Sequence, residues 1–410
     1  MNKLFKVITL IVALMLILAI MAGCRTKPVE IGDYHIGIVT WPQDLFEETE
    51  TMYRSVQALV AEFGATADGG MIRHVSLPDD FEEDVETVTS ITAGLADDPL
   101  MKAIVISQPI PAEGTTDAFR RIRDIGRDDI LLIASTPHDE LSDIYKLADI
   151  VVDWGDDLRG YYDILRAKLM GAETFVFMTN QRHMGIGYIA RRIAVCEEAC
   201  KDMGIEFVLE MVPDPSKTGR NVAQQAVYDM IPDLIKKYEK NTVFYGTHSA
   251  YAVPSIQRAL ELGAIFVTTD DVTPLNGFPE ALGLDLSALG DDYPAIVAKI
   301  EESVVAKGGS GRLGCFPYEI AYCSGLGLAR LAMDMIEGKG TGDTRKDIEA
   351  SFQAITPGCD WLVRVYEGQD ISEKVGNYYL VSMDTYIFDQ GYSGVFSEPF
   401  SEKHKTFNRP

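Results

Sequence analysis

Short apolar runs and amphipathic stretches alternate along most of the chain. The runs YHIGIVT (34–40), KAIVISQP (102–109) and TFVFMTN (174–180) are rich in β-branched and aromatic residues and are short enough to be strands. Longer stretches with apolar residues at helical spacing stand between such runs, for example at 187–203 and 222–238. Continuous apolar strands that alternate with helices are typical of parallel sheets covered on both faces.

The rest of the chain continues this alternation. Further strands are predicted at 129–136, 149–154, 207–213, 241–247, 264–270, 280–286, 361–368 and 377–388, and further helices at 45–62, 114–125 and 160–170. These strands are more than one small sheet needs. We therefore predict an α/β fold with two doubly wound parallel-sheet lobes joined by hinge crossings.

The segment Asp153–Gly160 is a natural break between the two sets of strands. The first lobe is expected to span 33–153 and to be completed by part of 287–360. The second lobe is expected to span 154–286 and to be completed by part of 361–410.

The N-terminus has the three parts of an export signal. Lys3 and Lys6 are followed by an apolar run, Val7–Met21, and then by two small residues before Cys24. The run is too short for a comfortable transmembrane helix. These residues resemble a bacterial lipoprotein signal, which implies cleavage before Cys24 and lipidation of its thiol. The alternative is ordinary cleavage, with no role for the cysteine.

The predicted signal peptide is thus 1–23, and a lipidated linker follows at 24–32. Its removal takes away two lysines and no acids, so the formal charge moves from −25 to −27. Such a charge repels phosphate backbones, and we expect no nucleic-acid partner. A lipid anchor would hold the protein outside the cytoplasm, on the outer surface of a membrane, either in a periplasm or at the cell surface.

Cysteine usage adds little chemistry. The odd number beyond Cys24 cannot all pair internally, and two of them at helical spacing without a nearby third ligand form a weak zinc signal. Buried free thiols, with at most one disulfide, are expected at Cys196, Cys200, Cys315, Cys323 and Cys359.

Two local patterns carry a family resemblance. In VVDWGDDLRGYYDILRAKLMG (151–171), a strand ends in Asp153, Gly160 opens the next helix, and another strand follows. This resembles the hinge of sugar-binding members of the type I periplasmic-binding-protein family. The stretch IARRIAVCEEACKDMGI (189–205) is a second local resemblance to this family. As a whole, the sequence is similar to a family of bacterial lipoproteins of unknown function with this fold. The resemblance implies the bilobed fold and names no ligand.

In open α/β sheets, ligands lie beyond the carboxyl ends of the strands. The residues at those ends mix aromatic rings, hydroxyls, amides and a few charges, which suits a small polar molecule with an apolar face. The candidate ligand-binding residues are Trp41, Gln43, Ser107, Gln108, Thr136, His138, Asp153, Trp154, Asn180, Arg182, His183, Thr247, His248 and Asp270.

Several of these residues have a second interpretation. Trp41 and Trp154 could stack on a ligand or could be core or hinge contacts. Arg182 with His183 could bind a carboxylate or phosphate, or could be a solvated loop pair. Asp270 could hold a ligand amine or hydroxyl, or could cap the next segment through an Asx turn.

Motifs for catalysis and cofactors are mostly missing. Gly309–Gly314 matches G-x-G-x-x-G, but it follows a helix rather than a strand, so it indicates a flexible turn. His138 and His248 lack the spacing of a metal site. We expect no cofactor and no metal.

These observations favour a lipid-anchored extracytoplasmic binding protein that captures a small molecule between its lobes for an ABC-type importer and its permease. A signalling lipoprotein whose closed form is recognised by a receptor is an alternative. A third is a cell-surface hydrolase using His138, His183 or His248 with Asp270.

Overall fold

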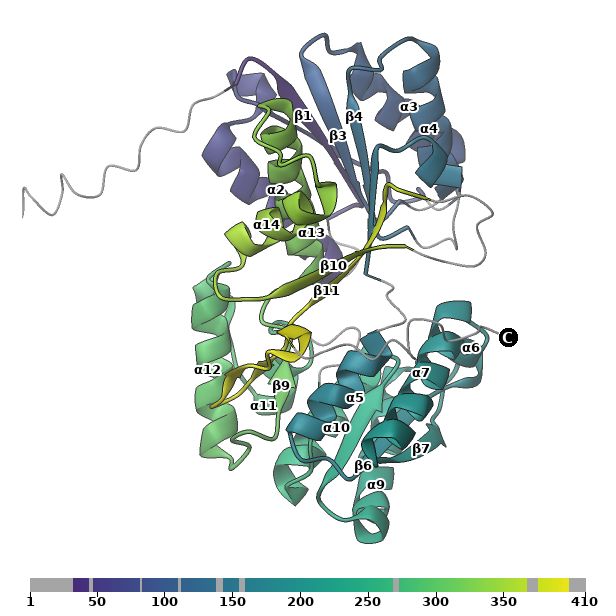
Figure 1. Cartoon of the computed structure of the whole chain (residues 1–410), viewed down its shortest axis with the longest axis vertical. Helices are drawn as coiled ribbons and strands as arrows, with labels where there is room; N and C mark the ends of the chain where they lie inside the picture. The colour runs from purple at the N-terminus through teal and green to yellow at the C-terminus, as the bar shows by residue number, and fades with distance from the viewer. Residues whose placement is uncertain are drawn as a thin grey trace, which may run out of the picture.

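The computed structural model describes residues 32–43, 47–81, 83–109, 112–137, 143–154, 159–267, 273–366 and 375–397. In these ranges the chain forms two α/β lobes, one above the other in Figure 1, so the predicted fold class is confirmed. The predicted signal peptide, Cys24, His138 and Asp270 lie outside the described residues.

The first lobe is built on a seven-stranded sheet with the order β10-β11-β5-β4-β3-β1-β2. β10 pairs antiparallel with β11, and every other neighbouring pair is parallel. The strands are β1 (His35–Thr40), β2 (Ile72–Ser76), β3 (Met101–Ser107), β4 (Leu131–Ser135), β5 (Ile150–Asp153), β10 (Trp361–Val365) and β11 (Tyr378–Met383).

Helices cover both faces of this sheet, which explains its continuous apolar strands. In β3, Ala103 and Val105 belong to one core cluster, whereas Ile104 and Ile106 belong to the other. The first face carries α2 (Glu47–Phe63), α13 (Ile320–Ile336) and α14 (Thr344–Ile355), and the second carries α3 (Val85–Ala93) and α4 (Ala112–Asp124), on opposite sides in Figure 1.

The second lobe contains a parallel sheet of β6 (Thr174–Thr179), β7 (Glu206–Met211) and β8 (Thr242–Gly246), in the order β7-β6-β8. A second three-stranded sheet comprises β9 (Gly314–Cys315), β12 (Tyr386–Ile387) and β13 (Gly391–Tyr392). The helices of the second lobe are α5 (Arg159–Leu169), α6 (Gln181–Met184), α7 (Gly187–Met203), α8 (Pro215–Thr218), α9 (Arg220–Tyr238), α10 (Ala252–Leu262), α11 (Phe278–Leu282) and α12 (Tyr293–Ala306).

Six 3-10 helices complete the described elements. They are η1 (Thr66–Asp68), η2 (Gly94–Asp97), η3 (Asp143–Lys146), η4 (Ser249–Tyr251), η5 (Ser287–Leu289) and η6 (Val395–Ser397).

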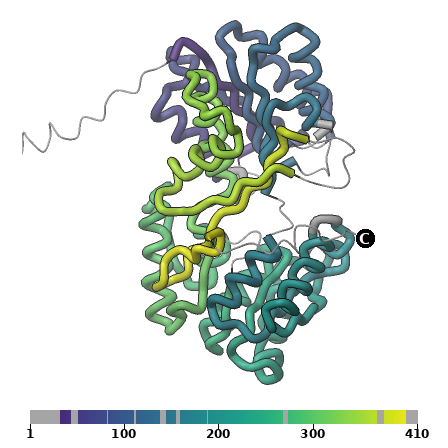
Figure 2. Tube along the Cα trace, viewed as in Figure 1, coloured from purple at the N-terminus to yellow at the C-terminus, as the bar shows by residue number. Residues whose placement is uncertain are grey.

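The chain passes between the lobes between β5 and α5, between β9 and α13, and between β11 and β12 (Figure 2). The tail is therefore shared. The sequence analysis expected part of 361–410 to complete the second lobe; β10 and β11 lie in the first sheet, and β12 and β13 lie with the second lobe. The third crossing is anchored by the buried carboxylate of Asp384, which accepts backbone N–H groups of Thr385 and Gly394, both at 2.7 Å.

Two predicted strands differ from the structure. The run 280–286 is wrong as a strand, because Pro279 in the first turn and Gly283 at φ 69° confine α11 between them. The run 264–270 contributes only bridges at Ile265 and Phe266 within its described part. The sequence analysis also missed β2, α3, α10, α13 and α14.

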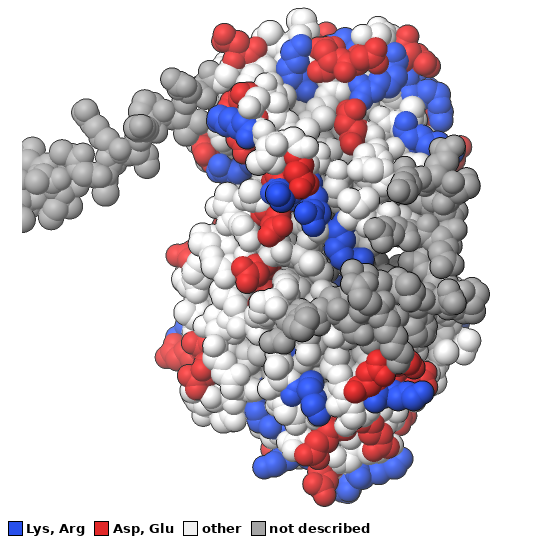
Figure 3. All heavy atoms as spheres, in the orientation of Figure 1, with Lys and Arg blue, Asp and Glu red and all other residues white. Residues whose placement is uncertain are grey.

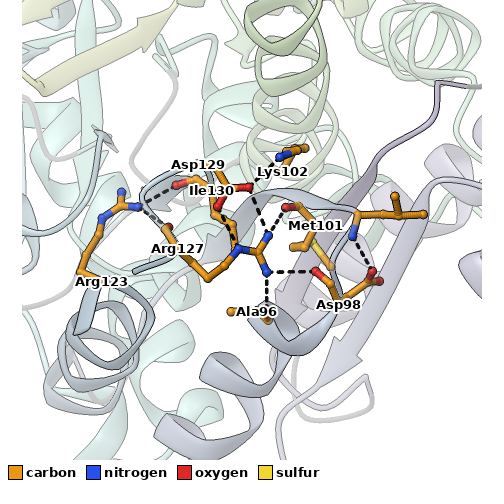
Figure 4. Close-up of polar contacts among 9 residues, drawn as sticks. Ala96, Asp98, Met101, Lys102, Arg123, Arg127, Asp129 and Ile130 are labelled. Atoms are coloured by element: carbon orange, nitrogen blue, oxygen red, sulfur yellow. Dashed lines mark hydrogen bonds and ion pairs between the residues drawn. The ribbon is translucent and has the colours of Figure 1, made fainter. Parts of the chain in front are cut away.

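An arginine-centred network lies at the amino-terminal ends of β3 and β4 (Figure 4). The Arg127 guanidinium donates to the carbonyl oxygens of Ala96, Asp98 (3.1 Å) and Met101 (2.7 Å). It also pairs with Asp129 at 2.8 Å, and this contact keeps the pKa of the Asp129 carboxyl well below its usual range. These contacts join three backbone segments at the end of the sheet opposite the carboxyl ends of its strands.

The five cysteines in the described part of the chain are all free and buried. Burial raises the pKa of the Cys200 thiol to about 12, so it behaves as an apolar core residue. Within the same part of the chain, none of the helices combines the length and apolar character needed to cross a membrane.

Candidate functional site

Two residues at the carboxyl ends of adjacent first-lobe strands have a left-handed backbone. Gln108 follows β3 and Thr136 follows β4, and each has φ 53°. Their N–H groups donate to the carbonyls of Ser135 (2.8 Å) and Val152 (2.7 Å), so each bonds across to the next strand in the sheet. Such a conformation costs an L-residue roughly 1–3 kcal/mol and is found preferentially at ligand sites.

The same end of the sheet contains buried polar atoms without partners among the described residues. Ser107 is 2% exposed, and in this part of the chain neither its Oγ nor the buried Oε1 of Gln108 has a hydrogen-bond partner. Trp41 donates its indole N–H to the Gln108 carbonyl at 2.8 Å, and its ring lies 5.2 Å from that of Phe81. Buried polar atoms normally have partners, so this edge has hydrogen-bonding capacity that a ligand could use.

The other first-lobe candidates lie in different surroundings. Asp153 accepts the Tyr378 hydroxyl at 2.6 Å, and burial together with this carboxylate raises the pKa of Tyr378 strongly. Trp154 donates to Ser324 Oγ at 2.9 Å and its ring lies 5.2 Å from that of Trp361, so it takes part in the core. Gln43 is exposed.

In the second lobe, two imidazoles stack at the carboxyl ends of β6 and β8. The ring centroids of His183 and His248 are 5.7 Å apart, with 14° between their planes. Thr247 Oγ1 lies 2.9 Å from His183 Nδ1. His248 Nδ1 accepts the Ala250 N–H at 3.0 Å, which leaves its proton on Nε2 in the neutral ring.

The charge of His248 is suppressed at this position. Desolvation, with smaller contributions from His183 and Arg182, lowers the pKa of His248 to about 4. At neutral pH its imidazole is therefore uncharged and can donate from one nitrogen.

Asn180 is the polar residue that organises this end of β6. It is 1% exposed, its Oδ1 accepts the His183 N–H at 3.0 Å as the N-cap of α6, and its Nδ2 donates to Tyr251 Oη at 3.0 Å. Tyr251 in turn donates to the Pro213 carbonyl at 3.0 Å. The sequence reasoning missed Tyr251, because it lies five residues beyond the end of β8.

Arg182 is engaged by a carboxylate that the sequence reasoning also missed. Its guanidinium donates to Asp214 at 3.0 and 3.4 Å, and this contact keeps the pKa of Asp214 well below its usual range. Asp214 directly follows the predicted strand 207–213, so the strand-end rule itself could have selected it. The Arg182 charge is thus balanced within the protein.

The structure brings the candidates together as two sets. Figure 1 shows that α6, which follows β6 directly, lies on the side of the second lobe that faces the first lobe. We call these sets the first half-site (Trp41, Ser107, Gln108 and Thr136) and the second half-site (Asn180, Arg182, His183, Thr247 and His248). Asp153 and Trp154 belong to neither set and lie at the end of β5, at the first crossing between the lobes.

Metal ligation and a charged binding surface have little support. In the part of the chain that the structure describes, there is no group of three or more His, Cys, Asp or Glu residues that could hold a metal ion. Acidic and basic side chains are interspersed over the described surface that is visible in Figure 3. The half-sites consist of hydroxyls, amides, an indole and two imidazoles, together with the Arg182 guanidinium, which is paired with Asp214.

Comparison with known proteins identifies sequence relatives. A model of the family "Protein of unknown function (DUF3798)" matches residues 34–314. An uncharacterized protein of Treponema pallidum (strain Nichols) is 40% identical over 193 residues, covering 47% of this chain and 84% of that protein. Another from the same organism is 34% identical over 220 residues, covering 53% of this chain and 98% of that protein.

Solved structures share the fold. A protein from Clostridium difficile 630, described as a candidate transcriptional regulator, superposes with a TM-score of 0.76 at 24% identity, covering 87% of this chain and 100% of that one. A periplasmic ribose ABC transporter protein from Conexibacter woesei gives a TM-score of 0.47 at 10% identity, over 88% and 94% of the two chains. The type I periplasmic-binding-protein-like fold of two α/β lobes is shared with the Clostridium difficile 630 structure.

Proposed function

The chain belongs to the family described as "Protein of unknown function (DUF3798)", and we propose that it is an extracytoplasmic solute-binding protein. It captures one small polar molecule between its lobes, with the first half-site on one side and the second half-site on the other. The ligand stabilises the closed arrangement because it contacts both lobes at once.

The observation that carries this proposal is the pairing of strain with unused hydrogen-bonding capacity at one sheet edge. Gln108 and Thr136 both have φ 53°, and Ser107 Oγ and Gln108 Oε1 are buried and have no partner among the residues that the structure describes. Strained backbone and unsatisfied polar atoms both lower stability, and both occur preferentially at functional sites. Their location at the carboxyl ends of parallel strands is the usual ligand position in such sheets.

The solute that fits best is neutral and rich in hydroxyl groups. The Arg182 guanidinium is balanced by Asp214, and His248 is uncharged at neutral pH because its pKa is lowered to about 4. The remaining groups are hydroxyls, amides, an indole and the His183 imidazole, all of which can exchange hydrogen bonds with a polyol. An anionic solute would need a cation that is not already paired.

The proposed cellular role follows from the N-terminus. Cleavage before Cys24 and lipidation of its thiol would tether the protein to the outer face of a membrane, and two or more acyl chains make such anchoring stable. There it would deliver its solute to the permease of an ABC-type importer. These steps rest on the sequence signal and on the fold.

Native mass spectrometry of the chain from Arg25 onward, which retains all described residues, tests the proposal. The probes are a pentose, a hexose and a nucleoside as neutral solutes, and a dicarboxylic amino acid and inorganic phosphate as anions. Saturable one-to-one binding of a neutral probe, or a co-purified neutral molecule lost on denaturation, is expected. Selective binding of an anion would contradict the solute class, and turnover of a bound probe would favour the hydrolase alternative.

A further inference from the structure

β7 is an open edge of the second lobe's parallel sheet. Among the residues that the structure describes, the sheet order is β7-β6-β8, and β7 has a neighbouring strand on one side only. Leu209 and Met211 on this strand are 38% and 49% exposed, although both are large and apolar. An exposed apolar edge strand is a ready template for pairing with another strand, and most proteins cover or charge such an edge.

The alternation of backbone N–H and C=O groups along β7 determines which residues can form hydrogen bonds on the side away from β6. The N–H groups of Glu206 and Val212 donate to β6-side carbonyls at 2.9 and 2.8 Å. Because inward and outward groups alternate along a strand in a parallel sheet, the even-numbered residues bond to β6. The N–H and C=O groups of Phe207, Leu209 and Met211 therefore point away from the sheet.

We propose that β7 pairs antiparallel with β7 of a second copy of this chain, around a two-fold axis at Leu209. In this register Leu209 faces Leu209 of the partner subunit. Phe207 faces Met211 of the partner subunit, and Met211 faces Phe207 of the partner subunit. All three outward-facing residues then exchange backbone hydrogen bonds, and the two three-stranded sheets become one six-stranded sheet.

Charge selects this register over its neighbours. Moving the axis to Val208 would place Glu206 opposite Glu210 of the partner subunit, and moving it to Glu210 would place that residue opposite its own copy. Like charges directly opposite each other destabilise an antiparallel pair. With the axis at Leu209, each Glu210 instead faces Val208 across the strands.

The side chains also complement one another in this register. Phe207, Leu209 and Met211 lie on one face of β7 because side chains alternate along a strand. The axis at Leu209 joins the two apolar rows, so Met211 contacts the Phe207 ring of the other copy, a favourable sulfur–aromatic pair. A single strand pair buries less than the roughly 1,200 Å² of a stable interface, so the dimer should be weak, with a micromolar dissociation constant.

Sedimentation equilibrium over about a hundredfold range of concentration through the micromolar region tests the association. The chain from Arg25 onward should shift toward twice its mass, and Leu209→Lys should stay monomeric because two ammonium groups meet at the axis. The matched control is Val305→Lys on α12, since Val305 is also 38% exposed. A chain that stays monomeric throughout, or equal association of both variants, would overturn the proposal.

Oxidative cross-linking of single-cysteine additions tests the register independently of affinity. Leu209→Cys places two thiols on residues about 5.5 Å apart between Cα atoms, within disulfide reach. Met211→Cys places them about 14 Å apart, since the two copies are offset by four residues. Rapid cross-linking at 209 and little at 211 is expected. Equal rates at both positions, or cross-linking at 211 alone, would rule out this pairing.

Discussion

The imidazole rings of His183 and His248 lie parallel, 5.7 Å apart, although 64 residues separate His183 from the Thr247 hydroxyl that its Nδ1 meets. Neither residue alone explains this arrangement. β6 and β8 are neighbours in the sheet, so the residues that follow them meet at one edge. Within this stack, the His248 imidazole is uncharged at neutral pH because desolvation lowers its pKa to about 4.

The suppressed pKa of His248 should make stability depend on pH. The imidazole takes up its proton near pH 6.5 when unfolded and near pH 4 when folded, so the unfolded state binds more protons between these values. The free energy of unfolding should therefore fall as pH drops from about 6.5 to about 4, by about 1 kcal/mol after allowance for partial exposure. When the free energy of unfolding is measured by urea denaturation at several pH values in this range, it should change less with pH for His248→Gln than for the unaltered chain.

The left-handed residues should separate stability from binding. Gln108→Gly keeps φ 53° accessible without steric cost and removes the amide. We expect the free energy of unfolding to stay unchanged or rise by up to about 1 kcal/mol, while solute affinity falls about tenfold. Denaturation and titration calorimetry measure the two effects. A large loss of stability would mean that Gln108 is primarily structural.

The Arg182–Asp214 pair should govern the charge of the solute. Asp214→Asn retains an N-cap for α8 but leaves the Arg182 guanidinium unbalanced. Affinity for a carboxylate probe relative to a neutral probe should rise about tenfold or more, because an unpaired guanidinium binds carboxylates through two parallel hydrogen bonds. Competition binding of the two probes checks this. Unchanged selectivity would place Arg182 outside the solute site.

The Arg127 network should contribute to stability alone. Arg127→Ala leaves the carbonyls of Ala96, Asp98 and Met101 without this donor, and we expect a loss of about 2–4 kcal/mol in the free energy of unfolding. Solute affinity should be unchanged under conditions where the variant is folded, since the network lies at the opposite edge of the sheet. This variant is therefore a control for the half-site substitutions.

Periodicity alone was enough to predict the layered fold. The run 174–180 became β6 and the stretch 187–203 became α7, because continuous apolar runs and helical spacing leave few alternatives. The run 280–286 was ambiguous, since its length suits either a strand or a short helix. β2 was missed because its sequence, IRHVS, is half polar.

The division of the tail could not be read from local patterns. β11 joins the first sheet through parallel pairing of Tyr378 with Val151, 227 residues earlier in the chain, and no local signal encodes that choice. Trp154 shows the same limit, because its core role depends on distant partners, Ser324 and Trp361. The strand-end rule named residues that are neighbours in the structure, such as His183 and Thr247, but it could not say how each side chain is used.

The claim that one solute contacts both lobes is tested most directly by titration calorimetry of a single neutral ligand, identified by native mass spectrometry, against two variants. Gln108→Gly alters only the first half-site and His248→Gln only the second. We predict that each weakens binding of the same ligand by about tenfold, a loss of about 1.4 kcal/mol. If one variant weakened binding and the other left it unchanged, the solute would be held by one lobe, and the account would be contradicted.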